Sequence, residues 1–259
     1  MTMRLLAAAL LLTQSADSAP AHIERSELRA GLDTLYAGEF ATAARLYADL
    51  SARDSADPAP IIFHAGAYIW WAAAKDSDDF AADLIDSLLD VAITKARRKP
   101  AGIERDFWLG TALGYRARER DLHGHSWGAS KDAKGMRDAY RRVLAADSSC
   151  IDCYLGLGLY DYGLARASTF ARLVAKLIGL GSGNAEEGLR MMHRAASGGD
   201  LARVEAAWVL ASALVREGDR DKQRPEPLRA EARAIVAGLA LRYPNNPVFQ
   251  RFLRKYPGS

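Results

Sequence analysis

The chain has 259 residues, with 35 Lys and Arg against 32 Asp and Glu, and its formal net charge is +3. A nucleic-acid-binding protein concentrates basic residues on one face or along one helix, and this near-balanced composition argues against a nucleic-acid partner. No segment after residue 21 is long and apolar enough for a transmembrane helix.

The first 21 residues have the layout of a secretory signal peptide. A basic start at Arg4 precedes an apolar run over Leu5–Leu12, and a polar stretch ends in Ala19-Pro20-Ala21. This combination is typical of a cleaved signal, and the apolar run is too short to span a bilayer. We therefore expect residues 1–21 to be removed, leaving 22–259 as a soluble exported protein of the periplasm or the medium. The alternative is a buried first helix.

Apolar residues then recur at helical spacing in five pairs of segments, and little of the chain alternates as a strand would. Polar or Gly-containing stretches at 121–131, 165–183 and 217–226 are predicted to be inserts between helices, the first of them a loop. The tail, Val248–Tyr256, is predicted to be a capping helix. The predicted pairs are Ile23–Ala37 with Phe40–Ala52, Ile61–Lys75 with Phe80–Arg98, Ile103–Glu119 with Asp132–Ala146, Cys150–Leu164 with Ala185–Ala196, and Leu201–Arg216 with Pro227–Arg242.

Motifs within these pairs resemble the tetratricopeptide repeat family. The first pair carries Gly31, Gly38-Glu39-Phe40, Ala43 and Tyr47, and later pairs carry Leu109-Gly110, Leu157-Gly158 and Pro244. Repeats of this family are helical hairpins of about 34 residues. The resemblance, to a divergent exported bacterial branch with inserts between repeat helices, implies an all-α, right-handed superhelix of about five irregular antiparallel helix pairs.

The same resemblance implies a non-catalytic protein-interaction or scaffold module of the cell envelope. Stacked hairpins present a concave surface, which in this family is built mainly by the first helix of each pair. We expect it to hold a segment of another protein or peptide, although about half of its large side chains should be buried between helices. The family's inner-face offsets place in this groove Phe63, Trp70, Phe107, Tyr115, Leu159, Tyr162 and Trp208.

The sequence gives little indication of catalysis, metal binding or a cofactor. It contains no phosphate-binding loop, nucleophile elbow or metalloprotease motif. His123 and His125 have only Asp121 as a nearby third ligand, so we predict no metal site. Cys150 and Cys153, three residues apart on a predicted helix, are within reach of a local disulfide; the alternative is two small buried side chains.

The insert around 165–181 supports a second hypothesis. Its apolar residues recur at helical spacing and its charges are all basic, as in a helix that lies on an anionic membrane or in a partner's groove. The alternative is that its apolar side packs inside the superhelix. The contact residues would be Arg166, Phe170, Arg172 and Lys176. A third hypothesis is a small-molecule binder or enzyme whose site combines the inserts with Asp161 or Glu205.

Overall fold

The computed structural model describes residues 23–168, 179–221 and 225–258, and these residues form eleven helices and no strand. The predicted signal peptide and residues 169–178 of the predicted insert lie outside the described residues. The helices are α1 (Arg25–Tyr36), α2 (Phe40–Arg53), α3 (Ala59–Lys75), α4 (Ala82–Arg98), α5 (Ile103–Leu122), α6 (Ser126–Ala146), α7 (Cys153–Arg166), α9 (Ala185–Gly198), α10 (Arg203–Arg220), α11 (Pro225–Arg242) and α12 (Pro247–Lys255).

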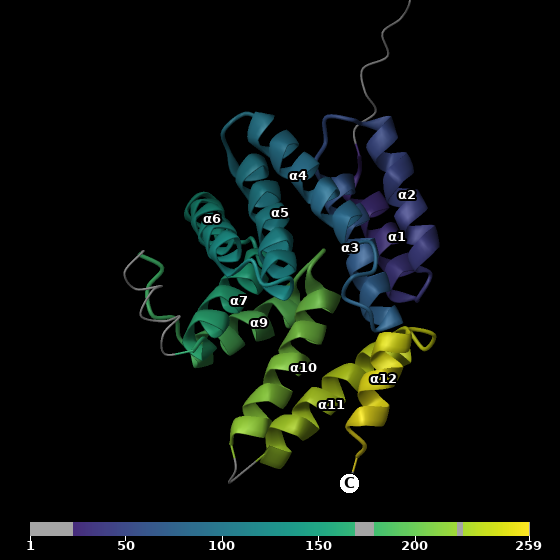
Figure 1. Cartoon of the computed structure of the whole chain (residues 1–259), viewed down its shortest axis with the longest axis vertical. Coiled ribbons are helices and arrows are strands. Elements are labelled where there is room, and N and C mark those ends of the chain that lie inside the picture. The colour runs from purple at the N-terminus through teal and green to yellow at the C-terminus, as the bar shows by residue number, and fades with distance from the viewer. Residues whose placement is uncertain (1–22, 169–178, 222–224, 259) are drawn as a thin grey trace, which may run out of the picture.

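The helices pack in chain order as a stack of antiparallel pairs (Figure 1), which confirms the all-α prediction and is consistent with a helical repeat array. Each helix packs mainly on the next one along the chain. In addition, α1, α3, α5 and α7 contact one another in succession. The first helices of the pairs therefore form one wall of the stack.

Glycine and tyrosine explain how the pairs close. A Cβ on Gly31 of α1 would lie 2.5 Å from the ring of Tyr47 on α2, and one on Gly110 of α5 would lie 2.8 Å from the ring of Tyr140 on α6. The Tyr47 hydroxyl also donates to the Leu28 carbonyl at 3.0 Å. Only glycine allows the two helices to approach so closely, and this requirement is the physical origin of the repeated motif.

The prediction of a loop at 121–131 is wrong for most of that stretch, because α5 continues to Leu122 and α6 already begins at Ser126. Asp132, which is buried, accepts hydrogen bonds from Arg116 at 2.8 Å and from Arg120 at 2.7 Å. These ion pairs join the end of α5 to the start of α6. Tertiary pairing thus overrides the polar composition that indicated a loop. Similarly, α10 extends to Arg220 and into the stretch predicted as an insert at 217–226.

The stack curls until its C-terminal end returns to its N-terminal end, where α12 lies beside α3 (Figure 1). The side-chain amide of Asn246 donates to the Tyr36 carbonyl at 2.9 Å. Arg251 of α12 donates to the carbonyls of Ala73 at 3.0 Å and Ala74 at 2.6 Å, near the end of α3. Carbonyls in the last turn of a helix lack partners within the helix, so the guanidinium group satisfies them.

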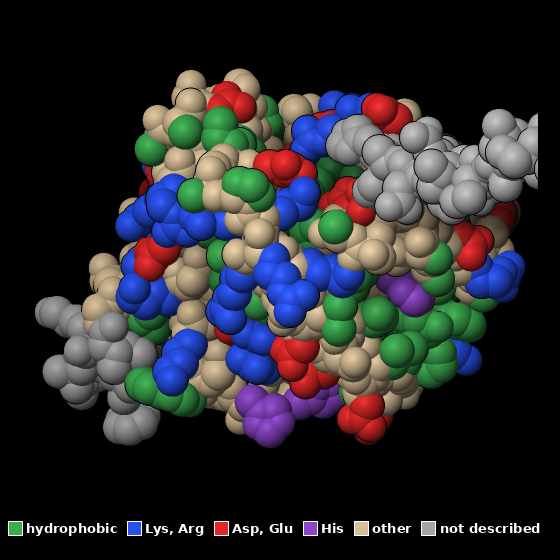
Figure 2. All heavy atoms as spheres, turned by 90° about the horizontal axis from the view of Figure 1, so that it is seen from above, with side chains coloured by type: hydrophobic (Ala, Val, Ile, Leu, Met, Phe, Trp, Pro, Cys, Tyr) green, Lys and Arg blue, Asp and Glu red, His purple; other side chains and the backbone are tan. Residues whose placement is uncertain are grey.

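Two further observations bear on the setting of the protein. Among the described residues, no helix combines the length and apolar character needed to cross a bilayer. On the face shown in Figure 2, Lys and Arg side chains are spread widely with Asp and Glu between them. That face therefore carries both signs of charge.

Candidate binding site

The residues predicted to line the groove lie in several environments. The ring centroids of Trp70 on α3 and Trp208 on α10 are 6.0 Å apart. Helices α3 and α10 therefore meet here instead of bounding an open groove. Leu159 stands apart, 40% exposed. Of the remaining predicted residues, Tyr115 is partly buried, as is Trp208, and the buried ones are Phe63, Trp70, Phe107 and Tyr162.

Helix α12 covers these tryptophans. The Phe249 ring lies 5.8 Å from the Trp70 ring and 5.8 Å from the Trp208 ring, and the Phe252 ring lies 5.6 Å from Trp208. Phe249 and Phe252 are both buried, while Arg251 reaches outward to α3. We call Trp70 and Trp208 the inner aromatic surface. Its occupant in the structure is an amphipathic helix of the same chain.

A partly buried polar pair joins α5 to α10. The Tyr115 hydroxyl of α5 donates a hydrogen bond to the Glu205 carboxylate of α10. Burial raises the pKa of the Glu205 carboxyl and also raises the pKa of the Tyr115 hydroxyl. The sequence pointed to both residues for different reasons and gave no sign that they would meet, since they are 90 residues apart.

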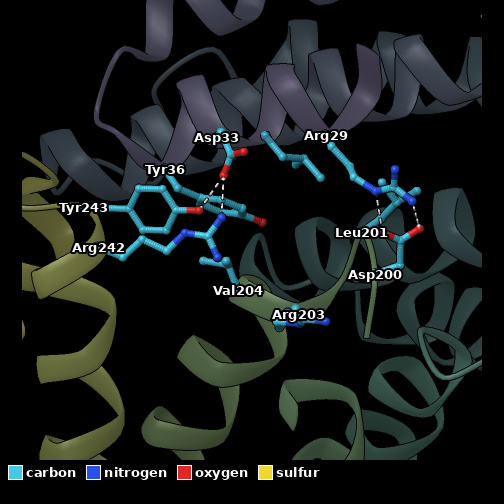
Figure 3. Close-up of a pocket in the computed structure, with 10 residues that line it drawn as sticks. Arg29, Asp33, Tyr36, Asp200, Leu201, Arg203, Val204, Arg242 and Tyr243 are labelled. Carbon is cyan, nitrogen blue, oxygen red and sulfur yellow. Dashed lines mark hydrogen bonds and ion pairs between the residues drawn. The ribbon is translucent and has the colours of Figure 1, made fainter. Parts of the chain in front are cut away.

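A cavity of about 160 Å³ lies where the two ends of the stack meet (Figure 3). On one side, Arg29 of α1 donates to both carboxylate oxygens of Asp200, at 2.5 and 2.8 Å. On the other, Asp33 accepts from Arg242 at 3.1 Å and from the Tyr243 hydroxyl at 2.6 Å. We call this cavity the closure pocket; it is lined by Arg29, Leu32, Asp33, Tyr36, Asp200, Leu201, Arg203, Val204, Arg242 and Tyr243.

Tyr36 is the most informative residue of the closure pocket. Its side chain is only 2% exposed, and its hydroxyl has no hydrogen-bond partner among the described residues. In Figure 3 this hydroxyl points toward the space between the two ion pairs. Burial raises the pKa of Tyr36, so the group remains a neutral donor. A buried polar atom without a partner is rare and costly, and this hydroxyl is one of three such side-chain atoms among the described residues.

Sequence reasoning missed the closure pocket. The Arg29–Asp200 pair joins residues 171 positions apart, and the Arg242–Asp33 pair joins residues 209 apart. Arg29 and Asp33 are four residues apart on one helix, a spacing that normally indicates a local ion pair. Only the folded structure, in which the two ends of the stack meet, shows that Arg29 and Asp33 each pair with a residue far away in the sequence.

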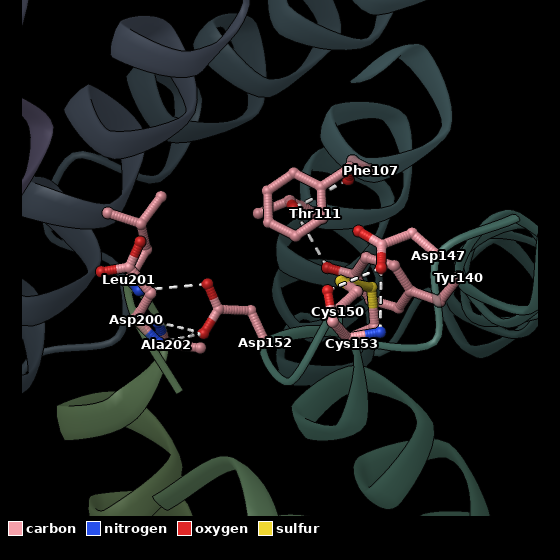
Figure 4. Close-up of a disulfide and its surroundings, with 11 residues drawn as sticks. Phe107, Thr111, Tyr140, Asp147, Cys150, Asp152, Cys153, Asp200, Leu201 and Ala202 are labelled. Carbon is pink, nitrogen blue, oxygen red and sulfur yellow. Dashed lines mark hydrogen bonds between the residues drawn. A yellow bond between two sulfur atoms is a disulfide. The ribbon is translucent and has the colours of Figure 1, made fainter. Parts of the chain in front are cut away.

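The predicted disulfide between Cys150 and Cys153 is present, and it lies next to Asp152, which bonds to the turn that carries Asp200 (Figure 4). Asp152, inside the disulfide loop, accepts hydrogen bonds from the backbone N–H groups of Asp200 at 2.6 Å, Leu201 at 3.1 Å and Ala202 at 3.3 Å. These bonds hold the turn before α10. They therefore fix the carboxylate of Asp200 opposite Arg29.

Of the residues predicted to contact a membrane or partner, only Arg166 is described. Its guanidinium pairs with Glu217 of α10, with Nε 2.8 Å from the carboxylate, and the Tyr162 hydroxyl donates to the same carboxylate at 2.9 Å. Arg166 is thus held against the stack. Phe170, Arg172 and Lys176 lie outside the described residues.

The described part of the chain holds no group of three or more His, Cys, Asp or Glu residues arranged to bind a metal ion. Comparison with models of protein families and with curated proteins finds no match. The class that the geometry defines is an all-helical stack whose consecutive helices pack as antiparallel pairs. It has an occupied inner aromatic surface and a charged pocket at its closure.

Proposed function

We propose that the protein is a non-catalytic interaction module of the cell envelope, a divergent tetratricopeptide-repeat stack that binds an amphipathic helix of a partner protein on the inner aromatic surface. The observation that supports this proposal is the docking of α12, an amphipathic helix whose phenylalanines pack on that surface.

The contacts of α12 define the chemistry of such a partner. Phe249 and Phe252 are three residues apart, the spacing by which helices in grooves present anchors from one face. Burying each phenylalanine contributes about 1.5–3 kcal/mol. Arg251, on another face, adds charge-assisted hydrogen bonds to the end of α3. A partner helix would need two aromatic anchors at this spacing and one basic residue.

Binding in this mode is an exchange, in which the partner helix takes the place of α12. Helix α12 is only nine residues long and packs on α3 and α11, so its departure would leave the contacts among the other helices in place. Docking of α12 lowers the apparent affinity for a partner by the fraction of molecules in which the surface is free. Any change that weakens docking should therefore strengthen partner binding.

The test compares Arg251→Ala with Arg254→Ala, a control on the same helix whose side chain is exposed. Loss of the Arg251 bonds to α3 removes on the order of 1.5 kcal/mol, which is about tenfold in the docking equilibrium. Each full-length protein is immobilised and used to capture proteins from an envelope extract. A peptide spanning residues 244–258 is then added as competitor, alongside the same peptide with alanine at positions 249 and 252.

The expected result is stronger capture by Arg251→Ala than by the parent or by Arg254→Ala, with release by the parent peptide and not by the alanine peptide. Equal capture by all three proteins, unaffected by either peptide, would contradict the proposal. Retention of anionic lipid instead of protein would favour the membrane-peripheral hypothesis.

A further inference from the structure

We propose that the protein has a second interaction surface, on α3 and the loop that follows it, and that this surface binds a basic peptide segment of another protein. It goes beyond the proposed function, because it lies apart from the inner aromatic surface. We call it the second aromatic surface, and its rings belong to His64, Tyr68, Trp71 and Phe80. Two observations carry the proposal: a lysine lies over these rings, and the loop beside them is acidic.

The rings of the second aromatic surface follow one face of α3. His64, Tyr68 and Trp71 have the spacing of four and three residues that places side chains on the same side of a helix. The ring centroids of His64 and Tyr68 are 5.4 Å apart, and those of Tyr68 and Trp71 are 5.9 Å apart. Phe80, from the loop between α3 and α4, places its ring 5.2 Å from that of Trp71. All four residues are partly exposed, so a ligand can reach this row of rings.

The position of Lys75 indicates that these rings attract a cation. Its ammonium nitrogen lies 4.9 Å from the centroid of the Phe80 ring and 5.8 Å from that of the Trp71 ring. The side chain is exposed and makes no hydrogen bond or ion pair with a described residue, so the ring faces are its partners. A cation within about 6 Å of an aromatic face is attracted by the ring quadrupole. An arginine or lysine of a partner can therefore bind beside Lys75 or in its place.

The loop beside the rings carries more acidic groups than its basic neighbours balance. Its exposed carboxylates, with one from the first turn of α4, are Asp76, Asp78, Asp79 and Asp83. Asp76 pairs with Arg251 at 3.0 Å. Asp79 lies 3.9 Å from His123. Asp78 and Asp83 have no ion-pair partner within the described part of the chain.

The charge count favours a basic ligand. Lys75 and Arg251 offset two of the four aspartates, which leaves two negative charges, or one when His123 is protonated. Complementary charge across an interface speeds association and disfavours ligands of the wrong sign. The aromatic faces and the carboxylates thus select the same kind of side chain, a cationic one.

The chain also contains a matched control for the ring cluster. Trp127 and Lys131 on α6 are four residues apart, as Trp71 and Lys75 are on α3, and the Lys131 ammonium lies 5.2 Å from the Trp127 ring. Trp127 is 56% exposed. No second ring lies beside it among the described residues. A comparison of the two sites therefore separates the effect of the ring cluster from that of an isolated tryptophan–lysine pair.

The test uses the full chain and the synthetic peptide Gly-Arg-Gly-Arg-Gly-Arg-Gly, titrated by calorimetry at low ionic strength. The same peptide with citrulline in place of each arginine is the uncharged analogue of similar shape. Trp71→Leu and Phe80→Leu each remove one ring, and Asp78→Asn removes a carboxylate that has no ion-pair partner among the described residues. Trp127→Leu is the control for the loss of an exposed tryptophan. Melting curves confirm that each variant is folded.

The expected result is saturable binding of the arginine peptide, about tenfold weaker for Trp71→Leu and for Phe80→Leu, because each loses a cation–π contact. Asp78→Asn should also weaken binding, and Trp127→Leu should leave it unchanged. The citrulline peptide should bind about tenfold more weakly than the arginine peptide. Lys75→Gln should bind the arginine peptide more tightly than the parent does, since it frees the ring faces and removes a like charge.

Four results would each overturn the proposal. They are no binding of the arginine peptide by the parent protein, equal affinity for the citrulline peptide, an affinity unaffected by both ring variants, and equal losses for Trp71→Leu and Trp127→Leu. The last result would show that any exposed tryptophan binds the peptide, without a contribution from the clustered rings.

Discussion

Truncating Asp152 should show how strongly one buried carboxylate stabilises the closure of the stack. The Asp152→Ala change removes the acceptor for three backbone N–H groups, those of Asp200, Leu201 and Ala202. Water can reach the exposed and half-exposed ends of this turn, but Leu201 is buried. Loss of a comparable helix-cap acceptor costs up to about 2 kcal/mol, and a buried N–H left without a partner adds about 1 kcal/mol at the lower end of its range.

The sum, about 3 kcal/mol, should lower the melting temperature by about 6–12 °C for a chain of this size. Thermal unfolding followed by circular dichroism measures the change. Asp147→Ala is the matched control, because Asp147 is only partly buried and accepts within its own turn, from the N–H and hydroxyl of Ser149. A fall of less than 2 °C for Asp152→Ala, or equal falls for both variants, would show that the turn before α10 does not depend on Asp152.

Three further changes test other parts of the structure. Glu205→Gln should stabilise the protein at pH 7 and above but not near pH 4: the folded-state pKa of Glu205 is raised, so its contribution is fully favourable below the unfolded value of about 4.3 and is lost as pH rises through the folded value. Melting curves across this range measure it, and a pH-independent difference would refute the burial of the charge. Reducing the Cys150–Cys153 bond should cost about 2 kcal/mol, or about 4–8 °C, and a variant with both cysteines replaced by alanine should not respond to reductant. Tyr36→Phe should raise the melting temperature by about 2–4 °C, because it removes an unpartnered buried hydroxyl worth about 1 kcal/mol; a fall would show that a water molecule satisfies it.

The helix pairs could be predicted from the sequence because their closure is local. Gly31 and Tyr47 are sixteen residues apart in one hairpin, and the need for a small residue opposite a large ring leaves a pattern that repeats along the chain. The disulfide could be predicted for the same reason, since Cys150 and Cys153 are only three residues apart. Short-range geometry restricts which residues can occupy such positions, and that restriction is visible in a single sequence.

The closure of the stack could not be predicted in this way. Whether a helical array ends as an open arc or meets itself depends on small rotations added over every hairpin, and no single residue encodes their sum. The inner-face offsets selected the aromatic side chains of Trp70 and Trp208, but they carry no information on whether α12 would cover them. In the sequence alone, the arginines of the closure pocket cannot be told from other exposed helical charges, because their partners lie far away along the chain.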